Sequence, residues 1–152
     1  MAGLEWRIAF AAGAALLVLG LSACVNDAVP EPAPVEAVEY PVAMTDTIND
    51  AGRILYAENC AVCHADPETG GERQFDAPRH DADGHTWHHP DRALVEWVLD
   101  GVPAGGVMPP FRDQLSEAQV SAIIAYIKST WPPDVQERQQ QMSQAWEDQV
   151  GG

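Results

Sequence analysis

Apolar residues recur at helical spacing just before the chain's one closely spaced pair of cysteines. They are Ile48, Ala51, Leu55 and Tyr56. Positions three or four apart share one face of a helix, so this pattern predicts a first helix over residues 47–59. Gly52 lies inside it, although a glycine in a helix interior costs about 1 kcal/mol relative to alanine. We therefore expect another backbone to approach this helix closely at Gly52.

Two later apolar stripes predict a second and a third helix. The stripes are Leu94, Val95, Val98 and Leu99, and then Val120, Ile123, Ile124 and Ile127. Pro90 fits the first turn of the second helix, and Gly101 ends it. Ser116 and Gln119 form a capping box at the start of the third helix, and two prolines stop it after Trp131. The segments between the helices are rich in glycine and proline and are expected to be loops.

The first 23 residues are interpreted as a targeting segment. An apolar run over residues 8–21 follows the weakly positive start that Arg7 provides. The run is short for a membrane span, which needs about 20 apolar residues, but it suits a signal peptide. It ends in Leu-Ser-Ala-Cys24, which resembles the lipobox of bacterial lipoproteins, where the cysteine is acylated and starts the mature chain. A plain signal peptide and an uncleaved anchor are the alternatives.

The remaining composition divides the chain into a tether, a domain and a tail. Residues 24–44 are rich in Pro, Ala, Val and Glu, a composition that cannot bury a core and tends to be extended. We expect them to form an acylated tether, followed by a folded domain over residues 45–133. Residues 134–152 form a Gln-rich tail, in which a weak stripe shares one helical face: Val135, Met142, Trp146 and Val150. This stripe predicts a tail helix that packs on the domain or a partner, or that frays.

The net charge of the chain excludes some classes of binding partner. The 152 residues carry a formal net charge of −15, and the first 23 contain one acid and one base, so their removal leaves −15. A surface this acidic argues against nucleic acid and against adhesion to anionic lipid headgroups. It is compatible with docking to a basic site on a partner, and equally with a role in solubility alone.

The strongest chemical motif is Cys60-Ala61-Val62-Cys63-His64. Two thiols three residues apart, with a histidine directly after them, are what covalent haem attachment requires. One turn of backbone lets Cys60 and Cys63 reach the two vinyl groups of one porphyrin. His64 is then held beneath the ring, where a neutral imidazole nitrogen can bind the iron.

Two other chemistries also use closely spaced cysteines. A thioredoxin-like redox pair requires a βαβ context, which the pattern of this chain does not supply. A structural zinc site requires four ligands, and the only other cysteine, Cys24, belongs to the lipobox. A zinc site completed by histidines remains as an alternative to haem.

The order of these features resembles a mono-haem class I c-type cytochrome over residues 45–133. A helix, the Cys-x-x-Cys-His motif, loops, a Met-Pro pair in a Gly-rich loop and a final helix follow one another. The resemblance implies a small all-α fold, with three to four helices around one covalently bound haem. In that family the first and last helices cross, and Gly52, Tyr56 and Tyr126 match the positions that meet there.

The resemblance also implies the axial ligands of the iron. His64 would be the proximal ligand and Met108 the distal one. A thioether is a soft ligand that suits iron in both oxidation states, and Met/His ligation raises the potential. Met44 and Met142 lie before and after the helices and are not well placed. Pro78 matches the family's proline whose carbonyl accepts the other N–H of the proximal imidazole.

Histidines gather with a tryptophan over residues 80–89: His80, His85, Trp87, His88 and His89. In the same family a tryptophan or another polar group on this side commonly holds a haem propionate. The resemblance therefore gives this role to His85, Trp87 and His88. Helix capping or surface display, and a second metal such as copper or zinc, are the alternatives for the cluster.

Together these features predict a single-electron carrier, not an enzyme, with one covalent haem c. We expect it on the periplasmic side of a bacterial membrane, anchored through Cys24, either free or as a subunit of an oxidoreductase complex. Its partners would be a redox donor and a redox acceptor, and not nucleic acid. The alternatives are a haem enzyme or gas sensor with an open distal site, and a zinc-stabilised interaction module.

Overall fold

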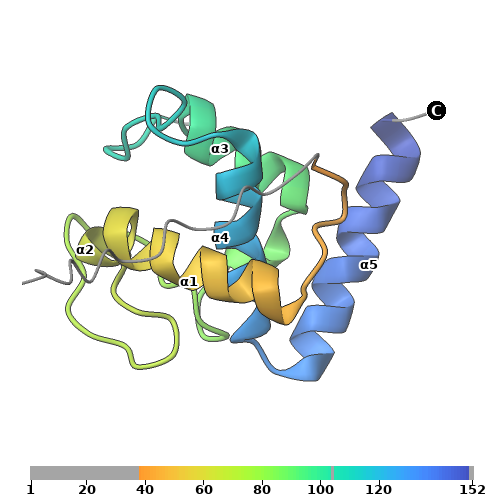
Figure 1. The fold of residues 1–152 in the computed structure, drawn as a ribbon, viewed down its shortest axis with the longest axis horizontal. Helices are drawn as coiled ribbons and strands as arrows, with labels where there is room; N and C mark the ends of the chain where they lie inside the picture. The colour runs from red at the N-terminus through yellow and green to blue at the C-terminus, as the bar shows by residue number, and fades with distance from the viewer. Residues whose placement is uncertain (1–37, 104, 151–152) are drawn as a thin grey trace, which may run out of the picture. The chain divides into compact units, whose positions relative to one another are not determined.

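The structure is a computed structural model that describes residues 38–103 and 105–150 (Figure 1). The elements over these residues are α1 (Asp46–Asn59), α2 (Ala61–His64), the short 3₁₀ helix η1 (Thr86–His88), α3 (Asp91–Asp100), α4 (Glu117–Ser129) and α5 (Pro133–Val150). Within the described ranges the only β pairing is an isolated bridge between Asp66 and Gly70. The predicted all-α fold is confirmed. No helix among these residues is long and apolar enough to cross a membrane.

The two most extensively packed helices are α1 and α4. They approach most closely at Gly52, where an added Cβ would lie 1.9 Å from the carbonyl oxygen of Ala122 and 2.9 Å from Cβ of Tyr126. Next to this contact the rings of Tyr56 and Tyr126 meet edge to face, with centroids 5.6 Å apart. The predicted close approach at Gly52, and the meeting of these two tyrosines, are both found.

The contact at Gly52 gives the first prediction. Gly52→Ala should destabilise the protein by about 3 kcal/mol, at the upper end of the cost of overpacking, because the new methyl meets backbone that cannot rotate away. Gly106→Ala is the matched control, since its Cβ would lie 3.9 Å from the nearest atom. Urea unfolding of the haem-loaded proteins measures both changes. Equal midpoints for Gly52→Ala and the wild type would contradict the packing described here.

The predicted capping box of α4 agrees with the structure, whereas the predicted start of α3 and the predicted end of α4 differ from it by one or two residues. Ser116 and Gln119 form the expected reciprocal capping box at the start of α4. Pro90 precedes α3 as its N-cap, with an extended ψ of 151°, and so does not lie in the first turn as predicted. α4 ends at Ser129, two residues before the predicted end, because Thr130 caps it and Trp131 N–H bonds back to Lys128 O.

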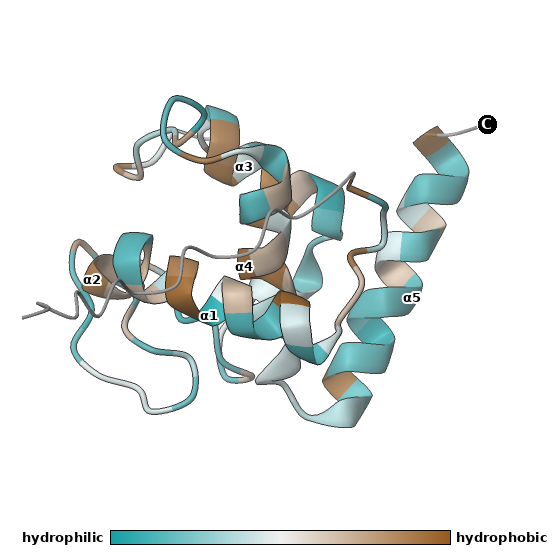
Figure 2. Ribbon diagram, viewed as in Figure 1, coloured by the Kyte–Doolittle hydropathy of each residue, from teal (hydrophilic) through white to brown (hydrophobic). Residues whose placement is uncertain are grey.

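The segment predicted as a tail is the 18-residue helix α5, and it packs on the domain through a polar face. Gln139 and Ser143 are its buried residues, whereas Trp146 and Val150 are 42 % and 55 % exposed. Figure 2 shows that α5 is mostly hydrophilic along its length. The predicted apolar stripe therefore does not form the packing face of α5. Of its residues, Val135 packs against the core.

A buried ion pair explains why a polar helix packs here. Lys128 Nζ of α4 lies 2.6 Å from Asp91 Oδ2 of α3, and both side chains are fully buried. Asp91 Oδ1 accepts from Gln139 Nε2 at 2.7 Å, and Asp91 N–H donates to Ser143 Oγ at 3.0 Å. Buried charges require this kind of polar surrounding, since an unpaired one would be costly. The polar residues of α5 supply it.

The same carboxylate also holds the chain before α1. Val42 is buried, and its N–H donates to Asp91 Oδ2 at 2.8 Å. Tyr40 packs on the core and lies under the Arg92 guanidinium, which in turn binds Glu147 of α5. Residues 40–42 thus pack against the helices ahead of the predicted domain start at residue 45, and α5 packs beyond the predicted end at residue 133.

The ion pair gives a second prediction. Lys128→Met should destabilise the protein by about 3–5 kcal/mol, the usual cost of leaving one charge of a buried pair without its partner. Arg112→Met is the control, because its ion pair with Asp100 is exposed and should contribute no more than about 1 kcal/mol. Urea midpoints of both variants are compared with that of the wild type. Similar small losses in the two variants would show that the buried pair does not hold α3, α4 and α5 together.

Candidate functional site

The Cys-x-x-Cys-His motif lies where α1 turns into α2. Cys60 closes α1 and starts α2, so that Cys63 N–H and His64 N–H both donate to its carbonyl, at 3.1 and 3.0 Å. This single helical turn places Cys60 and Cys63 on neighbouring positions of one face. Both cysteines are free thiols, with Cys60 buried and Cys63 half-buried. The spacing that covalent attachment to two vinyl groups requires is therefore present.

The environment of Cys60 does not suit a reactive thiol. Burial raises the pKa of its thiol to about 12, and the neighbouring Cys63 adds to the shift. Redox-active cysteines instead need a pKa low enough to form the thiolate. The buried thiol of Cys60 therefore does not suit the thioredoxin-like interpretation.

His64 is buried and held in one tautomer. Its Nδ1 lies 2.8 Å from the carbonyl oxygen of Pro78, which can only accept, so Nδ1 carries the proton. The lone pair of Nε2 is then free to bind a metal. Burial lowers the pKa of His64, against a smaller opposing effect of the Pro78 bond, so the imidazole is neutral at pH 7. The expected contact between His64 and Pro78 is present in this geometry.

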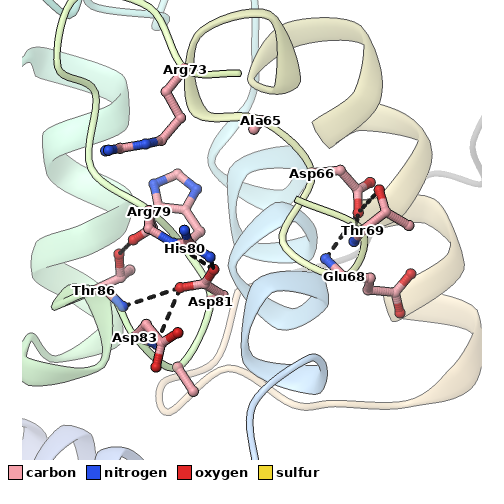
Figure 3. A network of polar contacts seen from close by, with 12 residues as sticks. Ala65, Asp66, Glu68, Thr69, Arg73, Arg79, His80, Asp81, Asp83 and Thr86 are labelled. Atoms are coloured by element: carbon pink, nitrogen blue, oxygen red, sulfur yellow. Dashed lines mark hydrogen bonds and ion pairs between the residues drawn. The ribbon is translucent and has the colours of Figure 1, made fainter. Parts of the chain in front are cut away.

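The loop that brings Pro78 to His64 is organised by two aspartates (Figure 3). Asp66 accepts the backbone N–H groups of Glu68 and Thr69, at 2.9 and 2.8 Å. Asp81 accepts the N–H groups of Asp83 and Gly84, both at 3.1 Å, and pairs with Arg79. The acid-rich loop thus satisfies its backbone polar groups locally, without a sheet or a helix.

Met108 lies in the loop between α3 and α4. It is half-buried, and the next residues are tied to the end of α3: Phe111 N–H donates to Val98 O and Leu99 O, and Arg112 N–H to Leu99 O. Arg112 also forms an ion pair with Asp100. The sulfur is therefore carried on a loop whose far end is fixed. The neighbouring Val107 is 79 % exposed.

The residues expected to hold a propionate lie at and before η1. Trp87 Nε1–H donates to Ala82 O at 3.2 Å, and the ring of His88 lies tilted against the indole, with centroids 3.6 Å and planes 32° apart. His85 and His88 are exposed. The indole has a single donor, so a propionate contact through Trp87 would require its bond to Ala82 to break. His85 and His88 are free of that restriction.

The four histidines do not form a metal cluster. Over the residues that the structure describes, no group of three or more His, Cys, Asp or Glu side chains could hold a metal ion. The ring of His80 instead stacks on that of His64, with centroids 4.1 Å apart, while His85 meets His89 edge to face. The alternative of a second metal finds no support in this arrangement.

One contact of the site was not expected from the sequence. The sequence places His80 in the histidine cluster over residues 80–89, yet it lies against the proposed proximal ligand and its carbonyl accepts Trp131 Nε1–H at 2.7 Å. The position of His80, two residues after Pro78, was the available signal.

Comparisons with known proteins find chains that are similar in sequence. The family model described as "Cytochrome C oxidase, cbb3-type, subunit III" matches residues 48–127. The "Cbb3-type cytochrome c oxidase subunit CcoP" of Rhodobacter capsulatus is 32 % identical over 127 residues, which cover 75 % of this chain and 42 % of the relative.

CcoP of Cereibacter sphaeroides is 31 % identical over 97 residues, or 60 % of this chain and 32 % of the relative. CcoP of an Azospirillum species is 28 % identical over 101 residues, which cover 60 % of this chain and 33 % of the relative. The chain spans less than half the length of these curated relatives. No solved structure matches it significantly.

Proposed function

The chain belongs to the cbb3-type cytochrome c oxidase subunit III family, so it is a c-type cytochrome with a covalently bound haem that transfers electrons. From this premise we propose that it is a single-electron carrier with one haem c. Cys60 and Cys63 form the thioethers, and His64 and Met108 are the axial ligands. The chain contains one Cys-x-x-Cys-His motif, which supports a single haem. It is not itself a catalyst.

The observation that carries the proposal is the hydrogen bond between His64 Nδ1 and Pro78 O. This bond leaves the lone pair of the neutral Nε2 free to bind a metal. His64 directly follows Cys63, and the two thiols are one helical turn apart. A carbonyl bound to the far nitrogen of a metal-binding imidazole fixes its tautomer and its orientation and raises its basicity. The arrangement fits an iron porphyrin attached at Cys60 and Cys63. A zinc ion would need two more ligands from this surface.

The haem supplies a one-electron iron couple, and the protein determines how it is used. The neutral His64 would occupy one axial position and the thioether of Met108 the other, so that no position stays open for a substrate or a gas. A soft sulfur ligand stabilises the reduced iron and raises the potential. The hydrogen bond to Pro78 O limits movement of His64, and the loop that carries Met108 is fixed at Phe111. His85 and His88 would contact the propionates.

A visible absorption spectrum, recorded with and without carbon monoxide, tests the proposal. The carrier should show six-coordinate, low-spin iron in both oxidation states and should not bind carbon monoxide rapidly. A high-spin spectrum with rapid carbon monoxide binding would instead identify a haem enzyme or gas sensor. A colourless protein that contains zinc would identify the interaction module.

The partners of the carrier are proposed from its relatives and its charge. The relatives are named as subunits of cbb3-type oxidases, so the electron acceptor or donor proposed here is a membrane oxidoreductase complex of that kind. The net charge of −15 supports docking to a basic site on such a partner. We place the domain on the periplasmic side of a bacterial membrane.

The anchor is proposed from the sequence, because Cys24 and the signal peptide over residues 1–23 lie outside the described residues. Acylation of Cys24 would tether the domain through the Pro-rich segment that follows it, and more than one acyl chain is needed for stable anchoring.

Cys24→Ser tests the anchor. It should abolish the acyl mass increment and move the protein out of the detergent phase, while the haem spectrum stays the same. If the mass and the detergent partitioning of this variant equal those of the wild type, Cys24 is not acylated.

A further inference from the structure

Two contacts act on the ring of His64 in different directions. The carbonyl of Pro78 holds the ring edge through Nδ1 at 2.8 Å, and the ring of His80 covers one face, with centroids 4.1 Å apart and planes 20° apart. A single hydrogen bond leaves the imidazole free to rotate about the line that joins donor and acceptor. A flat ring packed against the face opposes that rotation. Together the two contacts define the plane of the imidazole.

His80 can do this because its own ring is fixed. Tyr56 OH donates its one proton to Ala65 O at 2.8 Å, so at its 3.0 Å contact with His80 Nδ1 the phenol oxygen accepts. His80 therefore carries its proton on Nδ1. The Tyr56 ring also meets the His80 ring edge to face, at 5.7 Å between centroids and 73° between planes.

The backbone of His80 is held as well. Trp131, directly after α4, donates its indole N–H to His80 O at 2.7 Å, and Trp131 is itself buried. The three elements that meet at His80 are thus α1 through Tyr56, the end of α4 through Trp131, and the loop that carries Pro78.

We propose that His80 is a positioning residue that fixes the plane of the His64 imidazole by stacking on it, with Tyr56 holding His80 in place. This inference rests on the proposed function, in which His64 binds the haem iron. The plane of an axial imidazole determines how the unpaired electron of ferric low-spin iron is distributed over the porphyrin. The hyperfine-shifted signals of the four haem methyl groups in the proton NMR spectrum therefore report it directly.

The experiment compares these methyl shifts in oxidised, haem-loaded variants. His80→Ala should narrow the spread of the four shifts, because the imidazole then samples more orientations and their effects average. His80→Phe should return the spread towards that of the wild type, since it keeps a flat ring on the same face. Tyr56→Phe should give an intermediate loss, because it removes the acceptor of His80 Nδ1–H, together with the donor to Ala65 O, and leaves the ring of His80 in place. His89→Phe is the matched control and should leave the shifts unchanged, since its ring meets those of His85 and Trp97 and not that of His64, and phenylalanine keeps a ring there.

The outcomes separate this inference from the function on which it rests. Wild-type methyl shifts in a folded His80→Ala protein with covalent haem would overturn the role of His80 and leave the carrier function intact. If His80→Ala does not fold, unchanged shifts in Tyr56→Phe overturn the proposal instead. A wild-type protein without a low-spin haem spectrum would contradict the proposed function itself.

Discussion

Met108→Ala is expected to bind carbon monoxide and cyanide readily, because the sixth position of the iron is then open. The oxidised wild type should show the weak near-infrared charge-transfer band of sulfur bound to ferric iron, and the variant should lack it. The midpoint potential should fall on the order of 0.2 V, a part of the roughly 0.8 V that axial ligands span. Optical redox titration measures the fall.

Three further variants test whether the effects are specific to ligation by Met108. Met44→Ala and Met142→Ala are matched controls, since both residues lie outside the loop that carries Met108 and should leave the band and the potential as they are. Met108→His should restore six-coordination at a potential below that of the wild type. Rapid carbon monoxide binding by the wild type, without the band, would rule out Met108 as a ligand and favour the enzyme or sensor.

Removal of both thiols, in a Cys60→Ala/Cys63→Ala double variant, is expected to abolish covalent haem completely. Each single variant should keep at most one thioether. A small domain buries a limited core, and the haem supplies much of its apolar interior, so the double variant should also lose thermal stability. Haem that remains with the polypeptide after denaturation and acid extraction measures attachment, and circular dichroism follows the unfolding.

Cys24→Ser is the control for the two thiol variants, because it removes the remaining cysteine of the chain and leaves both attachment positions intact. It should retain full covalent haem. Covalent haem retained by the double variant would show that the Cys-x-x-Cys-His motif is not the attachment site.

The helices around the site could be predicted because their signals are local. Apolar spacing located α1, α3 and α4, and Ser116 with Gln119 marked the start of α4. Gly52 revealed the crossing of α1 and α4 because a glycine inside a helix needs a reason, and the carbonyl of Ala122 supplies it. The family resemblance then paired Pro78 with His64, and the structure shows the hydrogen bond.

The packing of α5 could not be predicted, because it depends on polar residues far apart in the chain. Apolar periodicity favoured Trp146 and Val150, whereas the buried face consists of Gln139 and Ser143. These residues become buried only because α3 and α4 together enclose Asp91 and Lys128. No local pattern marks a lysine in an apolar helix as half of an ion pair with a residue 37 positions away.

His80 illustrates the same limit within the site. Its sequence neighbours place it in the histidine cluster over residues 80–89, and only the fold of the loop brings its ring onto His64. The contact requires Tyr56 on α1 and Trp131 after α4 to meet the loop at one point. Each of these three residues is ordinary in its own segment, so the arrangement is visible only in three dimensions.

The proposed function requires that Cys60 and Cys63 carry one covalently attached haem. The most direct measurement is the intact mass of the denatured protein, produced in a host that matures c-type cytochromes. We expect the mature chain, acylated at Cys24, to carry the added mass of one haem, which acidic organic extraction does not remove and which Cys60→Ala/Cys63→Ala lacks. A wild-type protein without the added mass of one haem would contradict covalent attachment at Cys60 and Cys63.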